Sequence, residues 1–216
     1  MSTLAAFPAV PGGVDLDALY APPAERIQKA VLDRLVDVHE EYLKVATFFC
    51  LATASGNGLD ASPRGGPPGF VRVLDPYTVA FADWPGNNRI ESMRNLEQDE
   101  RVGMLFLFPG LDVFLRINGI ARVSAWPDLL ATLVEHGKTP KTATVVRLNE
   151  VLFHCGKAGN RARLWEPDSQ VDRSKVPTPG QMMVRLTGIS KEEGAQLDTL
   201  HAHAVPHDLY KPAAAA

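Results

Sequence analysis

The stretch that decides the fold runs from Asp60 to Asn95 and reads DASPRGGPPGFVRVLDPYTVAFADWPGNNRIESMRN. Two turn-like segments that carry glycine and arginine, SPRGG (62–66) and PGNNR (85–89), flank an apolar segment with strand character. The second turn leads directly into a short helical pattern. Backbone N–H groups, side-chain amides and guanidinium groups arranged in this way can hold an anion. The stretch therefore predicts a phosphate-bearing ligand on a β scaffold.

The first segment offers several donors in a short space. Ser62 supplies a hydroxyl, Arg64 supplies a fork of N–H groups, and the pair Gly65–Gly66 lets a ligand approach the backbone closely. The alternative interpretation is a hairpin turn with an exposed arginine.

The second segment begins a predicted helix. Gly86 permits an unusual backbone angle, and Asn87 or Asn88 can cap the helix that follows. Arg89 would then lie in the first helical turn, where the helix dipole disfavours a cation unless an anion is bound nearby. A simple capped surface helix is the alternative.

Arginine replaces lysine throughout the middle of the chain. No lysine occurs between Lys44 and Lys138. The arginines of this interval are Arg64, Arg72, Arg89, Arg94, Arg101, Arg116 and Arg122. Arginine is preferred where phosphate or carboxylate is recognised through two parallel hydrogen bonds, so this usage supports an anion site.

Composition excludes several classes of protein. The chain has 216 residues, of which 45% are hydrophobic, and this is enough for one domain with extensions. The net charge of −3 gives no reason to expect nucleic acid, and no apolar run approaches the roughly 20 residues that span a bilayer. The N-terminus lacks the pattern of a signal peptide, and the two isolated cysteines indicate reduced thiols. We therefore expect a cytoplasmic protein.

The hydrophobic pattern predicts many short strands and few helices. The predicted strands cover 46–54, 69–74, 77–82, 101–108, 112–124, 144–155 and, late in the chain, 181–188. The predicted helices cover 23–44, 88–96, 126–137 and 191–204. The absence of strict β-α alternation favours a mainly β, α+β fold, a small barrel with helices outside.

Side chains alternate between the two faces of the strand predicted at 112–124. Val113, Leu115 and Ile117 share an apolar face, whereas Arg116 and Asn118 share the other. The polar face is either a ligand-facing surface or a solvated one.

The usual catalytic patterns are missing. The sequence contains no GxGxxG, Walker or Gly-x-Ser-x-Gly motif. His154 and Cys155 would point to opposite faces of a strand, and His201, His203 and His207 lack the cysteine or carboxylate frame of a metal site. We expect no metal centre and no Rossmann-type nucleotide site.

Four blocks taken together are similar to a known family. They are SPRGGPPGFVRVLD (62–75), ADWPGNNRIESMRN (82–95), RVGMLFLFPGLDVFLRINGIARV (101–123) and HCGKAGNRARLW (154–165). In this order they resemble the pyridoxamine 5′-phosphate oxidase-like family of FMN-binding split-barrel proteins, and most of all its PPOX-class subgroup of flavoproteins. The resemblance covers roughly residues 25–166.

The resemblance implies a split β-barrel of about six antiparallel strands, and a homodimer with FMN at its interface. It places Ser62, Arg64 and Gly65 at a strand end beside the flavin, and Asn87, Asn88 and Arg89 in the segment that clasps the phosphate. Asp83, Ser92 and Asn95 would lie near the same site. Arg116 and Asn118 would approach the cofactor, from the second subunit in one arrangement, and Lys157 with Arg161 would close the pocket.

The resemblance also suggests how the chain is divided and what it does. We expect an extended arm at 1–22, the FMN-binding domain at 23–166, and a linker, late strand and C-terminal helix packed on the barrel at 167–216. The Arg-Leu-His element that binds vitamin B6 in the true oxidases is not visible after Trp165. The expected function is an FMN-dependent oxidoreductase that acts on a small organic substrate or uses a reduced nicotinamide. The alternatives are a flavin carrier or redox sensor without catalysis, and a barrel that binds haem or a deazaflavin.

Overall fold

The computed structural model describes residues 13–56 and 58–210, and the chain divides after Val31 into two compact units. In the first unit, α1 (Leu16–Leu19) begins where the Asp15 carboxylate accepts hydrogen bonds from the backbone N–H groups of Asp17 and Ala18. α2 (Glu25–Lys29) follows. The first twelve residues of the predicted arm lie outside the described residues. The rest of the arm is not purely extended, because it contains α1.

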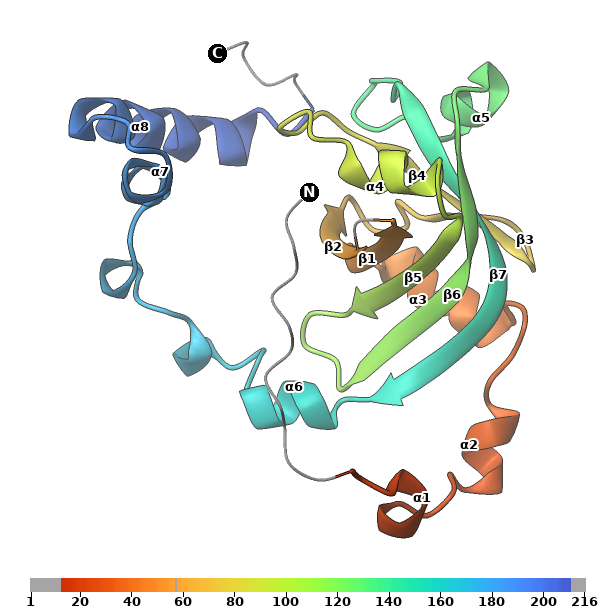
Figure 1. Ribbon diagram of the computed structural model, residues 1–216. Coiled ribbons are helices and arrows are strands. Elements are labelled where there is room, and N and C mark those ends of the chain that lie inside the picture. Colours follow the sequence, from red (N-terminus) through yellow and green to blue (C-terminus); the bar gives the residue numbers. More distant parts are fainter. Residues whose placement is uncertain (1–12, 57, 211–216) are drawn as a thin grey trace. The chain divides into compact units, whose positions relative to one another are not determined.

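The second unit is built on one antiparallel sheet of seven strands in the order β2-β1-β5-β6-β7-β4-β3 (Figure 1). The strands are β1 (Phe48–Ser55), β2 (Gly58–Gly65), β3 (Arg72–Asp75), β4 (Thr78–Asp83), β5 (Arg101–Leu107), β6 (Val113–Ser124) and β7 (Thr142–Cys155). Six of them were predicted from the sequence. The seventh, β2, contains the SPRGG segment that was interpreted as a turn. Within the described residues no ladder joins β2 to β3, so backbone pairing does not close the predicted barrel.

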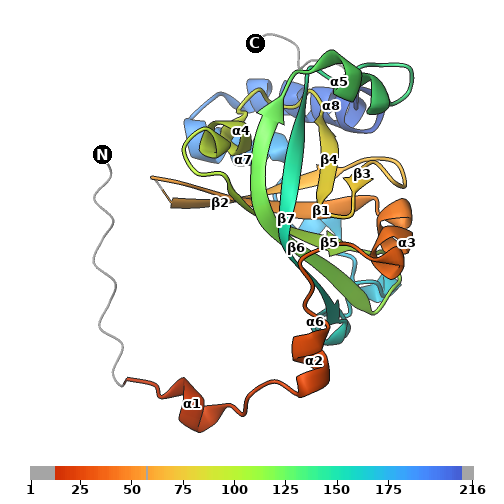
Figure 2. The same cartoon turned by 90° about the vertical axis from the view of Figure 1, so that its right-hand side faces the viewer.

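The second unit also contains helices. They are α3 (Asp37–Val45), α4 (Glu91–Leu96), α5 (Pro127–Thr132), α6 (Lys157–Ala162), α7 (Pro179–Thr187) and α8 (Lys191–His207), with short 3₁₀ turns at Pro167–Ser169 and Arg173–Lys175. β6 and β7 run side by side over most of their length, with α5 at one end of the pair and α6 at the other (Figures 1 and 2). α4 packs on β1 and β2.

The core lies on the concave side of the sheet and is centred on aromatic rings. The Phe49 ring contacts Phe70, Phe81 and Phe106, with ring centroids between 4.9 and 5.7 Å apart. A smaller cluster on the other face of β4 joins Ala80 and Ala82 to leucines of α5 and its C-terminal end. β4 is therefore buried on both faces, and its C-terminal end, at Asp83, is paired with β7.

The single helix predicted over 23–44 is wrong in its middle. Leu32 pairs with Val151 of β7 through two backbone hydrogen bonds, of 3.1 and 2.7 Å, so this segment is extended. α3 begins only at Asp37, and the neutral His39 ring accepts a hydrogen bond from the Val36 N–H at 3.1 Å. Burial lowers the pKa of His39, which keeps the ring nitrogen available as an acceptor. A tertiary pairing thus overrides a local helical pattern.

The late strand predicted at 181–188 is also wrong, because this segment is α7. Thr178 accepts a hydrogen bond from the Gln181 N–H, Pro179 occupies the first helical position, and Gly188 ends the helix at φ +77°. α7 packs on α8, where Asp198 accepts hydrogen bonds from the Thr178 hydroxyl at 2.6 Å and the Gly180 N–H at 2.7 Å.

Candidate functional site

One cavity of about 690 Å³ gathers both motifs of the opening stretch. Its walls come from β2, the end of β4, the loop 84–90, the start of α4 and the start of β7. The predicted site residues that line it are Ser62, Arg64, Gly65, Asp83, Asn87, Asn88, Arg89 and Ser92. We call this space the β2–α4 cavity.

The β2 wall presents an arginine whose charge is poorly compensated. Ser62 and Arg64 pair with the buried residues Leu51 and Phe49, so both side chains lie on the concave side of the sheet. Arg64 donates to the Pro63 carbonyl at 2.9 Å, and no carboxylate of the described residues lies within ion-pair distance of it. Burial lowers the pKa of Arg64 and raises the pKa of Asp83, and the attraction between the two charges offsets each shift only in part.

The loop wall has a strained backbone. Asn88 (φ +60°) and Ile90 (φ +43°) both adopt the left-handed conformation, which is costly for a β-branched residue such as isoleucine. The Asn87 side chain accepts a hydrogen bond from the Arg89 N–H at 3.1 Å. α4 begins at Glu91, so neither asparagine caps it and Arg89 precedes its first turn, contrary to the prediction. Alternating backbone conformations of this kind can form a concave anion-binding surface of N–H groups.

Arg89 is held by its neighbour Glu91. The Arg89 Nε donates to both carboxylate oxygens at 2.9 Å, and Nη2 also contacts Oε1. Hydrogen bonding to Glu91 raises the pKa of Arg89. Both side chains are exposed, and exposed ion pairs add little to stability. A ligand anion can therefore take the place of Glu91 at small cost.

α4 is fixed to the sheet by two polar contacts. The Ser92 hydroxyl donates to the Ser62 hydroxyl at 3.2 Å and so joins the two walls of the cavity. Asn95 donates to Thr53 at 3.0 Å and to Asp60 at 2.6 Å. Asn95 does not line the cavity, and it holds α4 in place.

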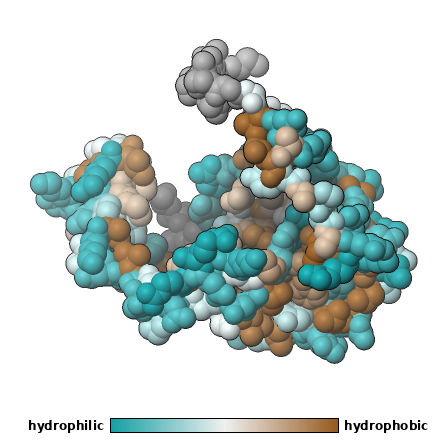
Figure 3. All heavy atoms as spheres, turned by 90° about the horizontal axis from the view of Figure 1, so that it is seen from below, coloured by the Kyte–Doolittle hydropathy of each residue, from teal (hydrophilic) through white to brown (hydrophobic). Residues whose placement is uncertain are grey.

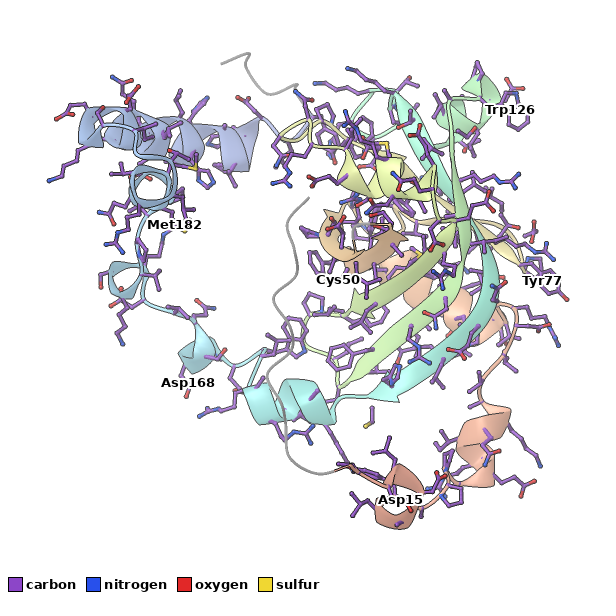
Figure 4. The ribbon with its side chains drawn as sticks, in the orientation of Figure 1. Asp15, Cys50, Tyr77, Trp126, Asp168 and Met182 are labelled. Atoms are coloured by element: carbon purple, nitrogen blue, oxygen red, sulfur yellow. The ribbon has the colours of Figure 1, made fainter. Side chains whose placement is uncertain are left out.

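Arg116 and Asn118 are not brought to the cavity. Both contact Glu150 of β7, at 2.6 and 3.0 Å, and the Arg116 Nε is buried without a hydrogen-bond partner among the described residues. Arg116 pairs with Leu105, which in turn pairs with Cys50 of β1. Cys50 is labelled in Figure 4. These side chains share the convex face of the sheet, so the sheet itself separates them from the β2–α4 cavity. Lys157, at the start of α6, does not line the cavity either.

The convex face is largely apolar where β1, β5, β6 and β7 meet. One row of paired residues crosses these strands and β2: Pro63, Cys50, Leu105, Arg116 and Leu152. A second row holds Ala61, Ala52, Gly103, Asn118 and Glu150. Leu105 is 39% exposed, although it lies in the middle of the sheet. We call these two rows the convex-face rows.

Several cavity residues were not among the site residues predicted from the sequence, and the chemically important ones are Trp84 and Lys141. Trp84 follows β4, and Lys141 precedes the strand β7 that pairs with β4. Trp84 lies within the opening stretch, but an aromatic residue there is not typical of anion binding, unlike the neighbouring glycines and arginines. Lys141 follows Trp84 by more than fifty residues in the sequence. Only the pairing of Asp83 with Thr142 brings it to the cavity.

Other kinds of site are not found in the part of the chain that the structure describes. No group of three or more His, Cys, Asp or Glu side chains there could hold a metal ion, and Cys50 and Cys155 are free thiols. No helix in the described ranges is long and apolar enough to cross a membrane.

Comparison with known proteins identifies the family. The sequence profile described as pyridoxamine 5′-phosphate oxidase matches residues 35–155, which is more than half of the chain. The chain belongs to this family. The segment that matches the family begins before α3 and ends with β7, so it contains the whole sheet and all the residues that line the cavity.

No curated protein is significantly similar in sequence. Among solved structures, the chain is similar to tagged HupZ from Group A Streptococcus, with 13% identity and a TM-score of 0.44 over 54% of this chain and 92% of that one. It is also similar to a Clostridium acetobutylicum protein related to general stress protein 26, with 11% identity and a TM-score of 0.42 over 55% and 86% of the two chains. An F420 reductase is 15% identical, with a TM-score of 0.40 over 56% and 98%. At these TM-scores the likenesses carry no argument of their own.

Proposed function

We propose that the protein is a flavoprotein that binds FMN in the β2–α4 cavity, and that it is an FMN-dependent oxidoreductase. It would act on a small organic substrate or take electrons from a reduced nicotinamide. The observation that carries the proposal is the convergence of two donor-rich segments, Ser62–Gly65 and Asn87–Arg89, on one cavity. Membership in the oxidase family supports a flavin-type ligand.

The donors present fit a phosphate group. Arg64 is half-buried and makes no ion pair with a carboxylate of the described residues, and the described partner of the Arg89 guanidinium is the exposed Glu91. Charge-assisted hydrogen bonds from guanidinium groups to phosphate oxygens are about twice as strong as neutral ones and are often bidentate. The left-handed residues Asn88 and Ile90 add backbone N–H groups to the same wall.

FMN, when bound, would carry the electrons, and the chain would supply binding, orientation and electrostatics. In this arrangement Ser62, Arg64 and Arg89 hold the phosphate, while Ser92 keeps α4 against β2. No protein nucleophile or catalytic triad is needed, in keeping with the sequence.

We further propose a homodimer in which a second copy supplies Arg116 and Asn118 to the cofactor. The convex-face rows support this arrangement, because they expose apolar residues around a half-buried ion pair between Arg116 and Glu150. Apolar residues reach the surface in several other places as well (Figure 3).

The first test is the visible spectrum of the purified protein, followed by heat release and identification of any ligand. Flavin absorbance with release of FMN is the expected result. A colourless protein that takes up no added FMN would refute the proposal. Absorbance bands of haem or a deazaflavin would replace FMN with that cofactor.

The role of Arg89 is tested with a matched pair of variants. Arg89 and Arg101 are exposed arginines that each pair with a carboxylate two residues away, but of the two only Arg89 lines the cavity. Loss of a charge-assisted contact costs about 1.5–3 kcal/mol, so Arg89→Ala should weaken FMN binding about 10- to 150-fold. Arg101→Ala should leave the dissociation constant unchanged in the same fluorescence titration. Equal affinity of both variants would count against the phosphate role.

Turnover separates catalysis from mere flavin binding. An oxidoreductase should be reduced rapidly by NADH or NADPH, or by an organic substrate, and should cycle with oxygen or another acceptor. Slow reduction without turnover by any donor would favour a flavin carrier or redox sensor.

A further inference from the structure

One wall of the β2–α4 cavity is made by residues that the phosphate site does not use. Trp84 and Lys141 lie at neighbouring strand ends, because Asp83 and Thr142, the residues beside them, form the last pair between β4 and β7. This wall combines an aromatic ring with a cation and comes from different segments than the donors of Ser62–Gly65 and Asn87–Arg89.

Trp84 presents hydrocarbon to the cavity. Its indole Nε1 is buried and has no hydrogen-bond partner among the described residues, so the polar atom is turned into the protein. The part of the ring that lines the cavity is therefore apolar. An apolar aromatic surface favours stacking or edge contact with a planar ring.

Lys141 is a free cation at the same wall. It is exposed, and no carboxylate of the described residues lies within ion-pair distance of it. An ammonium group on a flexible stem attracts carboxylates and other anions as a point charge. The Trp84 ring can therefore contact the aromatic ring of a ligand, while the Lys141 ammonium pairs with an anionic group on the same ligand.

Tyr210, near the end of the described chain, packs against the Trp84 ring. The Tyr210 ring meets the Trp84 ring edge-on, with centroids 4.8 Å apart and planes at 83°. The Tyr210 hydroxyl donates to the buried Glu135 at 2.9 Å, and its carbonyl accepts from Lys138 at 3.1 Å. Burial and the Glu135 contact raise the pKa of Tyr210 to about 12, so the hydroxyl remains a donor at neutral pH. These contacts fix the Tyr210 ring, and the Tyr210 ring in turn limits how Trp84 can move.

We propose that Trp84 and Lys141 form the substrate subsite of the cavity, which takes a planar aromatic carboxylate, and that Tyr210 is the positioning residue for Trp84. The proposal rests on the FMN function proposed above. Trp84 contacts the substrate ring, Lys141 pairs with its carboxylate, and Tyr210 acts only through Trp84.

The charge is tested with two probes of nearly equal shape, benzoate and benzamide, titrated into the FMN-loaded protein and followed by the flavin absorbance. The wild type should bind benzoate about tenfold more tightly than benzamide, the effect of one charge-assisted contact. Lys141→Met should remove that preference and leave the affinity for benzamide and for FMN unchanged. Lys175→Met, at an exposed lysine outside the cavity, should keep the preference.

The ring is tested at Trp84 and Tyr210. Trp84→Leu and Tyr210→Ala should each weaken the binding of benzoate and of benzamide by the same factor, about three- to tenfold. The affinity for FMN and the preference for benzoate over benzamide should not change. Tyr210→Phe loses the Glu135 contact but keeps the ring edge against Trp84, so it should restore part of the binding of both probes. A general loss of structure would instead lower the FMN affinity of Tyr210→Ala, which would overturn the positioning role.

The outcomes separate this inference from the proposed function. If FMN binds but benzoate shows no preference or no binding, only the substrate subsite is refuted. If Lys141→Met weakens FMN itself, Lys141 belongs to the cofactor site and the subsite is refuted. If the wild type takes up no FMN, both proposals are refuted.

Discussion

Arg64 and Asp83 face the same cavity from two strands that do not pair, and burial disfavours the charge on each of them. The two strands are β2 and β4, which lie near opposite ends of the sheet order. Burial holds the pKa of Asp83 above its usual range, and the Arg64 charge counteracts this only in part. An ionised Asp83 is therefore a cost that the folded protein carries at neutral pH.

Asp83→Asn should stabilise the protein at neutral pH. A carboxyl with a raised pKa in the fold loses stability as the pH rises from the usual aspartate range through its folded-state value, because the unfolded chain ionises first. At pH 3 the carboxyl is protonated in both states and the penalty vanishes. We expect the variant to melt about 2 °C above the wild type at pH 7, and with no comparable gain at pH 3, by circular dichroism. Asp112→Asn, at an exposed aspartate, serves as the control.

A stabilisation of Asp83→Asn that is equal at both pH values would contradict this account. Such a result would show that the amide improves packing or hydrogen bonding, with no contribution from the carboxylate charge.

Many of the polar residues that line the cavity could be predicted because they are close in sequence. Ser62, Arg64, Asp83 and the run Asn87–Arg89 all lie within one stretch of 36 residues, and their types are typical of anion binding. Lys141 could not be found, since its place depends on the β4–β7 register. Asn95 is a residue type that can bind an anion, but its side chain does not point into the cavity. Its amide donates to Thr53 and Asp60 instead and holds α4 in place.

At the scale of elements, α7 and α8 form a hairpin whose crossing depends on two glycines. A Cβ atom on Gly180 would meet the Gly194 carbonyl oxygen at 1.9 Å, and one on Gly194 would meet the Val184 side chain at 2.7 Å. The backbones can approach this closely only without side chains at these positions.

Gly180→Ala should open this hairpin and leave the sheet intact. Overpacking of this kind costs about 1–3 kcal/mol, so hydrogen-exchange protection of α7 and α8 should fall about 5- to 150-fold. The amides of β5, β6 and β7 should keep their protection. Gly56→Ala, where a Cβ meets nothing within 4 Å, is the control. Equal loss of protection in the sheet would contradict the independence of the hairpin. Met182 marks the position of α7 in Figure 4.

The errors in element prediction have physical causes. Ile27, Val31 and Leu35 fit a helical repeat, yet Leu32 gains two backbone hydrogen bonds from β7 by being extended. The run QMMVRLT is apolar enough for a strand, but Thr178, Pro179 and Gly188 are start and stop signals of a helix. β2 could not be predicted because its concave-side residues, Asp60, Ser62 and Arg64, are polar, and because its glycines resemble a turn.

At the scale of the whole molecule, the proposed homodimer makes Leu105 a central contact. Burying a glutamate there without a partner would cost several kcal/mol, so Leu105→Glu should produce monomers at micromolar concentration. FMN affinity should fall in parallel, because Arg116 and Asn118 would be supplied by the second copy. Light scattering after gel filtration measures the mass. Leu74→Glu, at an exposed leucine of β3, should remain dimeric.

A wild type that is monomeric with FMN bound would refute the dimer. A Leu105→Glu variant that stays dimeric would place the interface elsewhere.

The two edge strands of the sheet, β2 and β3, have features that hinder the addition of further strands from other chains. An unpaired strand edge is a template on which other chains can add as β-strands, and this is how many aggregates begin. β2 carries Pro63 within its ladder, so the proline nitrogen faces away from β1 and removes one outward donor. β3 has only four residues, and its pairing register shifts between Val73 and Asp75. Neither edge offers a long regular template, which favours association through sheet faces over growth into fibres.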